Sequence, residues 1–231
     1  MLWPFRSPET RKRQLAASVE HPAARRYLET PFADRRTPVW EQDYLVLDFE
    51  TTGLNMRRDA ILSMGYTEIH QGRVQMSACT HHIIKVNIPL PPATVVVHKI
   101  TDDRMNAGIH LHDALHELVE RMTGKVLIAH FAQIERSFLH AAMERVYGHK
   151  LPLQVIDTLA LEKRRLDRSQ QPVRPSQLRL GNLRQQYNLP RYGAHNALQD
   201  AIATAELYLA ELSHAPEQGH KLKLGDVLEP G

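Results

Sequence analysis

The chain has 231 residues, of which 42% are hydrophobic, and this is enough apolar material for one sizeable core. No apolar run approaches the roughly 18 residues of a membrane span, and the opening residues lack an apolar stretch of signal-peptide length, so we expect no membrane partner and a cytoplasmic protein. The single cysteine, Cys79, excludes an internal disulfide and a zinc site built on several cysteines.

Positive charge is concentrated in two parts of the chain. Residues 1–42 carry eight Lys/Arg and five Asp/Glu, so the whole formal net charge of +3 resides there, while residues 43–231 balance at 21 of each. Within the balanced part, the stretch from Lys163 to Arg191 holds eight basic residues and one acid, Asp167. Such a cluster suits a polyanion such as nucleic acid, but a solvated face has the same composition and is favoured on charge alone.

Residues 1–42 form an N-terminal extension that five prolines interrupt. We expect short helices at Pro8–Glu20 and Ala23–Glu29, in a segment that packs on the domain, binds a partner or is partly disordered. The regular pattern of residues 43–213 predicts one domain, and residues 214–231 form a short polar tail.

The regular part begins with three strands. Tyr44–Glu50 is a buried apolar strand, and Ala60–Ile69 and Arg73–Ile84 are two more, joined by a Gln71-Gly72 turn that predicts a hairpin. We expect these strands to form an antiparallel meander. Prolines at positions 89, 91 and 92 then predict a loop.

Helices and short strands alternate in the second half. Apolar spacing predicts helices over Leu111–Met122, Ile134–Tyr147, Leu159–Leu166, Leu180–Tyr187 and Asn196–Leu212. Short buried strands are expected at Val126–Ala129 and Val155–Thr158. Three strands followed by this alternation indicate an α/β fold with a mixed sheet, in which a site usually lies at the carboxyl ends of the strands.

Two acidic side chains, Asp48 and Glu50, stand at such a strand end. Residues i and i+2 of a strand point to the same face, so these two carboxylates should lie side by side. Their repulsion and burial are costly, and a cation that prefers oxygen ligands, Mg²⁺ or Mn²⁺ rather than zinc, would offset both. A solvated acidic strand end is the alternative, and this stretch alone does not decide between the two.

Three downstream residues can complete the acidic pair. Glu135 begins a helix just after a short apolar strand, where a carboxylate also suits the helix dipole. Asp200 lies on the last long helix, five residues after His195. On one continuous helix these two side chains would diverge by about 140°, so we expect Asn196 to cap the helix and His195 to fold back from the preceding loop. Taken singly, each residue is more often an ordinary surface or helix-start side chain.

The combined pattern is more specific than its parts. Four carboxylates and one histidine in this order fit two-metal hydrolysis of phosphodiesters, in which ions roughly 3.5–4 Å apart clamp the attacking and leaving oxygens. A neutral imidazole can accept the proton of the attacking water.

Five segments carry a resemblance to a known family. They are LDFETTGL (residues 47–54), VHKIT (97–101), AHFAQIERSFL (129–139), DTLAL (157–161) and HNALQDA (195–201). In this order they resemble the motifs of the DEDDh 3′–5′ exonucleases, the superfamily of the proofreading epsilon subunit of bacterial DNA polymerase III. The resemblance covers about Asp43–Ser213 and implies a ribonuclease H-like α/β fold with a mixed five-stranded sheet flanked by helices.

The resemblance also implies a role for each matched position. Asp48, Glu50 and Asp200 would hold the metal that carries the attacking water, and Asp48 would bridge to a second metal that Glu135 supports. His195 would be the general base. Substrate contacts are implied for Thr51, Thr52, Gly53, Leu54, His98 and Thr101. For the last two of these, packing of a structural loop is an equal alternative.

The chain departs from the family pattern in its second motif. Glu135 stands where the family has Asp, with one more methylene, and Phe131 stands where the family has Asn. The longer arm can still reach the second metal if the backbone lies slightly farther away. Phe131 either stacks on a base or fills core space, and we favour the core.

We therefore expect a 3′–5′ exonuclease that uses two Mg²⁺ or Mn²⁺ ions and releases nucleoside 5′-monophosphates from single-stranded or frayed 3′ ends, with DNA favoured over RNA. Given the resemblance, we favour a role in phosphate contacts for the basic stretch, made by Arg164, Arg165 and Arg168. The alternatives are a non-catalytic accessory module that binds nucleic acid and a hydrolase of very short oligonucleotides. The short tail favours a free-standing enzyme over a polymerase subunit, and no pattern indicates the oligomeric state.

Overall fold

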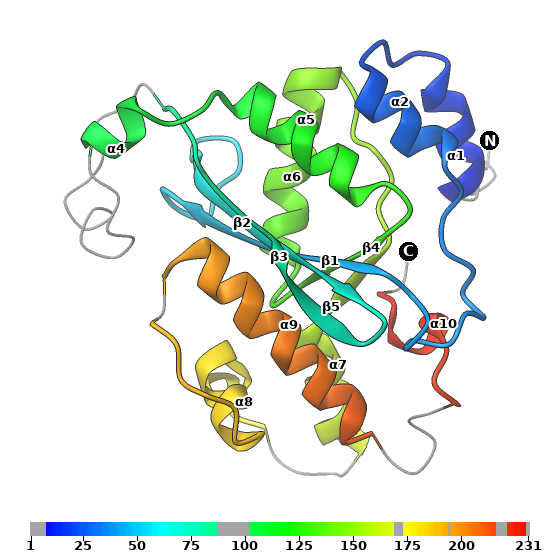
Figure 1. Ribbon diagram of the computed structural model, residues 1–231, viewed down its shortest axis with the longest axis vertical. Helices are drawn as coiled ribbons and strands as arrows, with labels where there is room; N and C mark the ends of the chain where they lie inside the picture. Colours follow the sequence, from blue (N-terminus) through cyan, green and yellow to red (C-terminus); the bar gives the residue numbers. More distant parts are fainter. Residues whose placement is uncertain (1–7, 87–101, 169–172, 194, 216–220, 230–231) are drawn as a thin grey trace, which may run out of the picture.

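A five-stranded mixed sheet organises the molecule (Figure 1). The computed structural model describes residues 8–86, 102–168, 173–193, 195–215 and 221–229. Its strands are β1 (Tyr44–Thr51), β2 (Ile61–His70), β3 (Arg73–Ile83), β4 (Val126–Ala129) and β5 (Val155–Asp157). Their order across the sheet is β3-β2-β1-β4-β5. The first three are antiparallel, whereas β4 is parallel to β1 and β5 is parallel to β4, which confirms the predicted meander and mixed sheet.

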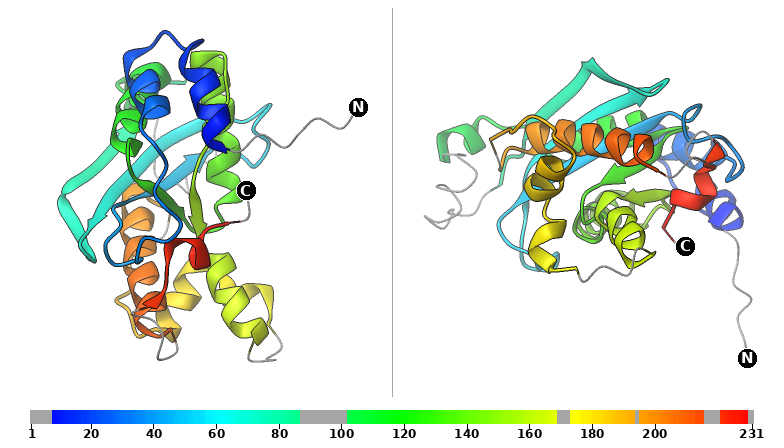
Figure 2. Two further views of the ribbon diagram at one scale, coloured as in Figure 1. Left: turned by 90° about the vertical axis from the view of Figure 1, so that its right-hand side faces the viewer. Right: turned by 90° about the horizontal axis from the view of Figure 1, so that it is seen from below.

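Helices cover both faces of this sheet (Figures 1 and 2). They are α1 (Pro8–Ala16), α2 (Pro22–Glu29), α4 (Asp102–Asn106), α5 (Leu111–Met122), α6 (Gln133–Tyr147), α7 (Thr158–Arg168), the 3₁₀ turn η1 (Pro175–Leu178), α8 (Leu180–Gln186), α9 (Ala197–Ser213) and α10 (Leu224–Val227). None of these helices is long and apolar enough to cross a bilayer.

Thr158 was expected to end a strand, and in the structure it begins α7. The reason is local, because the Oδ1 atom of Asp157 accepts the backbone N–H of Leu159 at 3.0 Å. A side-chain acceptor for a first-turn N–H favours a helix start, so the strand ends at Asp157.

Side chains of β1 point alternately to the two faces of the sheet and so contribute to two hydrophobic clusters. Leu45, Leu47 and Phe49 belong to the cluster that contains α5 and α6. Tyr44 and Val46 belong to the cluster that contains Ala205, Tyr208 and Leu212 of α9. Because side chains alternate along a strand, the next two positions on the α9 side are 48 and 50. The same pattern that builds the core therefore presents the two carboxylates toward α9.

The described part of the N-terminal extension is packed into the fold. Ala24, Tyr27 and Leu28 of α2 are buried in the same cluster as the apolar face of α5. The hydroxyl of Tyr27 donates to the carbonyl oxygen of Pro152 at 2.7 Å. Of the expectations for this extension, the described residues show packing on the domain.

The tail was expected to be polar, and its described part contains a small apolar anchor instead. Leu224, Val227 and Leu228 are buried in the cluster on the α9 side of the sheet. Their spacing of three and four residues is that of one helical face, and it is too short to stand out in the sequence. The N–H of Leu224 also donates to the carbonyl of Thr37 at 2.8 Å, which joins this tail to the extension.

Truncating Leu28 tests whether α2 belongs to the fold. Leu28 is 2% exposed, whereas Leu54 is 77% exposed and provides a matched control. We expect Leu28→Ala to lower the free energy of unfolding by about 2–4 kcal/mol, because a buried leucine leaves a cavity. Leu54→Ala should change it by less than about 0.5 kcal/mol. Urea unfolding of both variants measures the difference, and equal losses would contradict the assignment.

Candidate functional site

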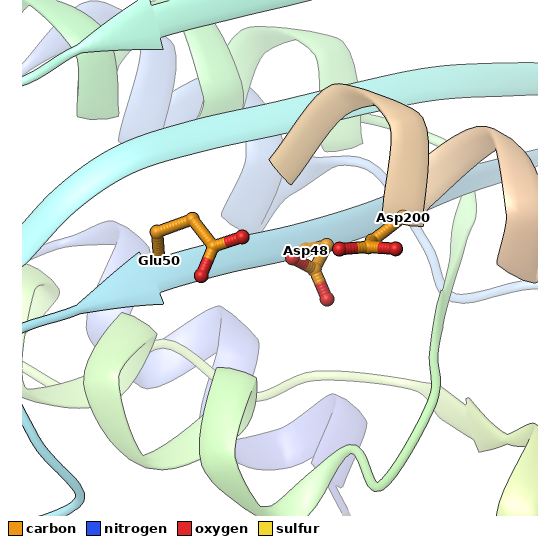
Figure 3. Close-up of side chains that lie close together, drawn as sticks. All are labelled: Asp48, Glu50 and Asp200. Carbon is orange, nitrogen blue, oxygen red and sulfur yellow. The ribbon is translucent and has the colours of Figure 1, made fainter. Parts of the chain in front are cut away.

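Three carboxylates meet on the α9 side of the sheet (Figure 3). Asp48 and Glu50 project from β1 and Asp200 projects from α9, with Asp48 between the other two. Each offers one oxygen to a group in which all three atoms lie within 4.8 Å of one another. Segments 150 residues apart in sequence therefore supply one acidic group.

Gly65 makes this meeting possible. It pairs with Asp48 across the β1–β2 ladder. A Cβ atom placed on Gly65 would lie 2.1 Å from the carbonyl carbon of Ala197 and from the amide nitrogen of Leu198, closer than any real contact. Only glycine lets the first turn of α9 rest on β2 here, and this brings Asp200 beside Asp48. Gly65 was not among the residues predicted from the sequence, although a glycine inside a strand pattern is a signal of a close backbone approach.

The start of α9 places His195 outside the helix. Asn196 is the N-cap, and its side chain accepts the N–H of Gln199 at 3.0 Å. Oδ2 of Asp200 accepts the backbone N–H groups of His195 and Asn196 at 2.9 and 3.2 Å. His195 has a left-handed backbone with φ of +67°, which turns the chain sharply before the helix. This is the cap-and-loop arrangement that the sequence predicted.

Glu135 lies in the first turn of α6 and is 7% exposed. Its Oε2 atom is buried and has no hydrogen-bond partner among the described residues. Burial raises the pKa of Asp48 most. The charge of Glu135 raises it further, and its effect is larger than that of Asp200 or Glu50. A buried carboxylate oxygen without a partner is costly, and it is the kind of group that a cation stabilises.

The site is strongly acidic and poorly solvated. Burial, with the charge of Asp200 added, raises the pKa of Glu50 to about 8. Burial also raises the pKa of Asp200, although the backbone N–H groups of His195 and Asn196 oppose this. The donors are all carboxylate oxygens, which suit a hard divalent cation such as Mg²⁺ or Mn²⁺ better than zinc. The residues present therefore fit a divalent metal, which Asp48, Glu50 and Asp200 would hold.

A groove of about 700 Å³ opens beside the acidic group. Asp48, His195 and Asp200 line it, and so do three arginines, Arg179, Arg184 and Arg191. The groove thus has an acidic part and a basic part, as a site for a metal and a phosphate chain requires.

The arginines predicted to contact phosphate are not among the residues that line this groove. Arg164 donates to the carbonyl of Val227 at 3.1 Å, and Nε of Arg165 donates to Glu162 at 2.9 Å. Arg168 lies with them on α7 and is exposed. Two of the three thus form contacts within the protein, which charge counting cannot reveal.

Arg184 ties the loop before α9 to the helix itself. It is 3% exposed and donates to the carbonyl of Pro190 and to Oε2 of Glu206, each at 2.7 Å. The ring of Tyr192 covers the guanidinium at 4.6 Å, and its hydroxyl donates to Oε1 of Glu206 at 2.8 Å. The sequence shows Arg184 only as one of the residues in a basic stretch. In the structure its hydrogen bonds hold the loop that carries His195.

The turn after β1 is held by its own side chains. The hydroxyl of Thr51 donates to the carbonyl of Gly53 at 2.7 Å, and that of Thr52 donates to Asp59 at 3.1 Å. A Cβ atom on Gly53 would lie 2.5 Å from Oδ2 of Asp59, so a side chain here would displace the carboxylate that accepts the hydroxyl of Thr52. Leu54 then points outward and is 77% exposed.

Phe131 was favoured as a core residue, and this is wrong, because its side chain is 47% exposed. Its backbone is left-handed, with φ of +63°, and its N–H donates to Oδ1 of Asp157 at 2.9 Å. This fixed turn directs the ring away from the interior. The predicted positions His98 and Thr101 lie outside the described residues.

Removing the charge of Glu135 should stabilise the metal-free protein at high pH. Burial, together with Asp157 and Glu50, raises its pKa above the ordinary value of 4.5. The folded state then binds the proton more tightly than the unfolded chain, so the free energy of unfolding falls as pH rises through this range. In EDTA, Glu135→Gln should melt higher than wild type at pH 8, and the two should converge as the pH approaches 4.5.

Glu144→Gln is the matched control for that measurement, because Glu144 lies on the same helix with its side chain 59% exposed. It should follow wild type at every pH. A gain for Glu135→Gln that did not depend on pH would contradict the charge explanation. Adding Mg²⁺ should raise the melting temperature of wild type more than that of Glu135→Gln.

Comparison with known proteins places the chain in a family. The sequence model of the family RNase_T, described as exonuclease, matches residues 45–208. The chain is 29% identical over 182 residues to DNA polymerase III subunit epsilon of Treponema pallidum, which covers 77% of this chain and 80% of the relative. It is 26% identical over 168 residues to the 3′-5′ exonuclease DinG of Staphylococcus saprophyticus, which covers 72% of this chain but only 18% of that relative.

Solved structures show the same fold at low identity. Exonuclease I of E. coli, in complex with a dA16 oligonucleotide, superimposes with a TM-score of 0.64 at 14% identity, over 77% of this chain and 42% of the other. Exonuclease X, in complex with 5′ overhanging duplex DNA, gives 0.58 at 18% identity, over 78% of this chain and 97% of the other. The ribonuclease H-like fold expected from the motifs is thereby confirmed. Since the match runs from β1 through most of α9 and encloses the whole acidic group, this chain belongs to the RNase_T exonuclease family.

Proposed function

We propose that this chain is a metal-dependent 3′–5′ exonuclease that shortens single-stranded or frayed 3′ ends, DNA in preference to RNA, and releases nucleoside 5′-monophosphates. The observation that carries the proposal is the group formed by Asp48, Glu50 and Asp200, within 4.8 Å of one another at the carboxyl end of β1. Support for DNA comes from the relatives, since the matched structures of exonuclease I and exonuclease X hold DNA.

We propose that the acidic residues hold two divalent ions. Asp48, Glu50 and Asp200 offer one compact set of oxygens, and Glu135 adds a buried oxygen without a partner among the described residues. Bound there, Mg²⁺ or Mn²⁺ would supply positive charge for the phosphate and lower the pKa of the attacking water. The charges of Glu135, Asp200 and Glu50 all act on Asp48, so Asp48 would be among the residues that hold divalent metal.

His195 is proposed as the general base. It is exposed, it lines the groove, and Asp200 fixes its backbone N–H. A neutral imidazole at this rim can accept the proton of the attacking water and pass it to solvent. Arg184 serves this role indirectly, because it holds the loop on which His195 lies.

Two exposed apolar side chains support recognition of a terminal base. Leu54 follows the carboxyl end of β1 and Phe131 follows that of β4, and these two strands are parallel neighbours. The carboxyl ends of parallel neighbours meet at one edge, so we infer that both side chains lie toward the edge that carries the acidic group. An aromatic face accepts any base at about 1–3 kcal/mol per stacked base, which suits removal without sequence preference.

A nuclease assay on matched substrates tests the proposal. The substrates are 5′-labelled DNA and RNA of one sequence and a dinucleotide, each with Mg²⁺ or Mn²⁺. Wild type should shorten DNA from the 3′ end, and Asp48→Asn, Glu135→Gln and His195→Ala should each lose at least about a hundredfold in kcat. Glu144→Gln should retain wild-type turnover. Metal-dependent cleavage of the dinucleotide alone would identify a hydrolase of short oligonucleotides.

Three outcomes would defeat parts of the proposal. Binding of DNA by wild type without metal-dependent cleavage would indicate an accessory module. Near-normal turnover by Glu135→Gln, with its fold intact by circular dichroism, would remove Glu135 from the metal site. A faster rate on RNA than on DNA would reverse the proposed preference.

The salt dependence of DNA binding distinguishes the two sets of arginines. Arg179 and Arg191 are exposed and line the groove, whereas Arg164 and Arg168 lie on α7. In a catalytically inactive Asp48→Asn background, replacing Arg179 and Arg191 with Gln should flatten the slope of log K against log salt by about 0.7 for each phosphate that is no longer neutralised. The same change at Arg164 and Arg168 should leave the slope unchanged. The reverse result would restore the α7 arginines as the residues that bind phosphate.

A further inference from the structure

Three histidines meet where α2 packs on α5, on the face of the sheet opposite α9. His112 and His116 stand one helical turn apart on α5, and their Nε2 atoms are 2.7 Å from each other. His21, the N-cap of α2, stacks its ring on that of His116 with centroids 3.3 Å apart and an interplanar angle of 6°. Neither the acidic group nor the groove contains any of these residues.

The Nδ1 atoms of His112 and His116 each have a polar partner within the protein. Nδ1 of His112 is 3.2 Å from Oδ1 of Asp113, and Nδ1 of His116 is 2.7 Å from the hydroxyl of Tyr147. A histidine that binds a metal through one nitrogen typically donates its other N–H to a carboxylate or a similar acceptor. Both rings therefore have outer partners of the kind that metal ligands have, and their two Nε2 atoms lie against each other.

The facing nitrogens need only a small adjustment to hold an ion. A single proton can lie between two imidazole nitrogens at 2.7 Å. Around a tetrahedral zinc, with Zn–N bonds of about 2.0–2.1 Å, two such nitrogens lie about 3.3 Å apart. The side chain of His112 is 61% exposed and has room to rotate by this amount. On binding, the shared proton moves to Nδ1 of His116, which then donates to the oxygen of Tyr147, so both Nε2 lone pairs face the ion.

His21 is the candidate for a third nitrogen. Its ring is stacked on that of His116 and its centroid is 6.1 Å from that of His112, so it would have to leave the stack and turn about its side-chain bonds to reach an ion shared with the other two rings. Its Nδ1 now accepts the N–H of Ala23 at 3.3 Å, a long contact that is easily given up when the proton shifts between its nitrogens.

We propose that His112 and His116, completed by His21, form a site for a divalent transition metal such as Zn²⁺, Co²⁺ or Ni²⁺, and that this metal fastens α2 to α5. The ligands are imidazole nitrogens, whereas the acidic group offers only carboxylate oxygens, so the two sites select different classes of cation. This site takes no part in phosphodiester hydrolysis, and its existence is independent of the proposed nuclease function.

Zinc titration in excess Mg²⁺ tests this site, because Mg²⁺ competes for the carboxylates and not for imidazole. Calorimetry should show one more equivalent of bound Zn²⁺ in wild type than in His112→Ala. Co²⁺ should give the visible absorption of a nitrogen-ligated ion in wild type only. Zn²⁺ should raise the melting temperature of wild type but not that of His112→Ala or His116→Ala, and His21→Ala should weaken binding at least tenfold.

His110→Ala is the matched control, since His110 is exposed at the start of the same helix and makes no side-chain capping bond. It should bind Zn²⁺ as wild type does. Because His112 is exposed, its variant keeps the fold, and its rate of DNA cleavage in Mg²⁺ should equal that of wild type. Equal Zn²⁺ stoichiometry and affinity in wild type and His112→Ala would overturn the proposal.

Discussion

The contact between the first turn of α9 and β2 is the constraint on which the site depends. Gly65 leaves no room for a side chain there, since a Cβ atom would fall 2.1 Å from the backbone of Ala197. This close approach sets the position of Asp200 relative to Asp48. It also determines where His195 stands, because Asp200 holds the backbone before the helix. The geometry of the site thus rests on backbone packing and not on flexible side chains.

Opposite charges divide the cleft. The acidic half is rigid because its carboxylates arise from a central strand and from a helix packed against it, and burial makes their charges unfavourable without a cation. The basic half is built around Arg184, whose guanidinium donates to a backbone carbonyl and to Glu206. A buried arginine of this kind acts as a structural fastener, and the exposed Arg179 and Arg191 line the rim.

Features set by local spacing were predictable, and those set by distant contacts were not. Side chains alternate between the two faces of β1, and this alone predicts that Asp48 and Glu50 share one face. Asn196 is a residue type that often caps a helix, which predicts that His195 lies outside α9. The outward turn of Phe131 was not predictable, because Asp157, 26 residues away, fixes its backbone. The same holds for Arg165, whose charge is engaged by Glu162. A glycine inside a strand signals a close approach at Gly65, but the sequence does not show that the approaching backbone is that of α9.

The two segments outside the matched residues 45–208 both contact the β5 edge of the sheet. β5 pairs with β4 on one side only, and on its other side the N–H of Glu229 donates to the carbonyl of Val155 at 2.9 Å. The side chain of Gln154 forms two hydrogen bonds with the backbone of Ala33, so the extension covers the start of the same strand. A fragment trimmed to the family limits would expose a bare strand edge, which is a template for self-association. The contacts that cover this edge and the residues of the acidic group therefore come from different parts of this sequence.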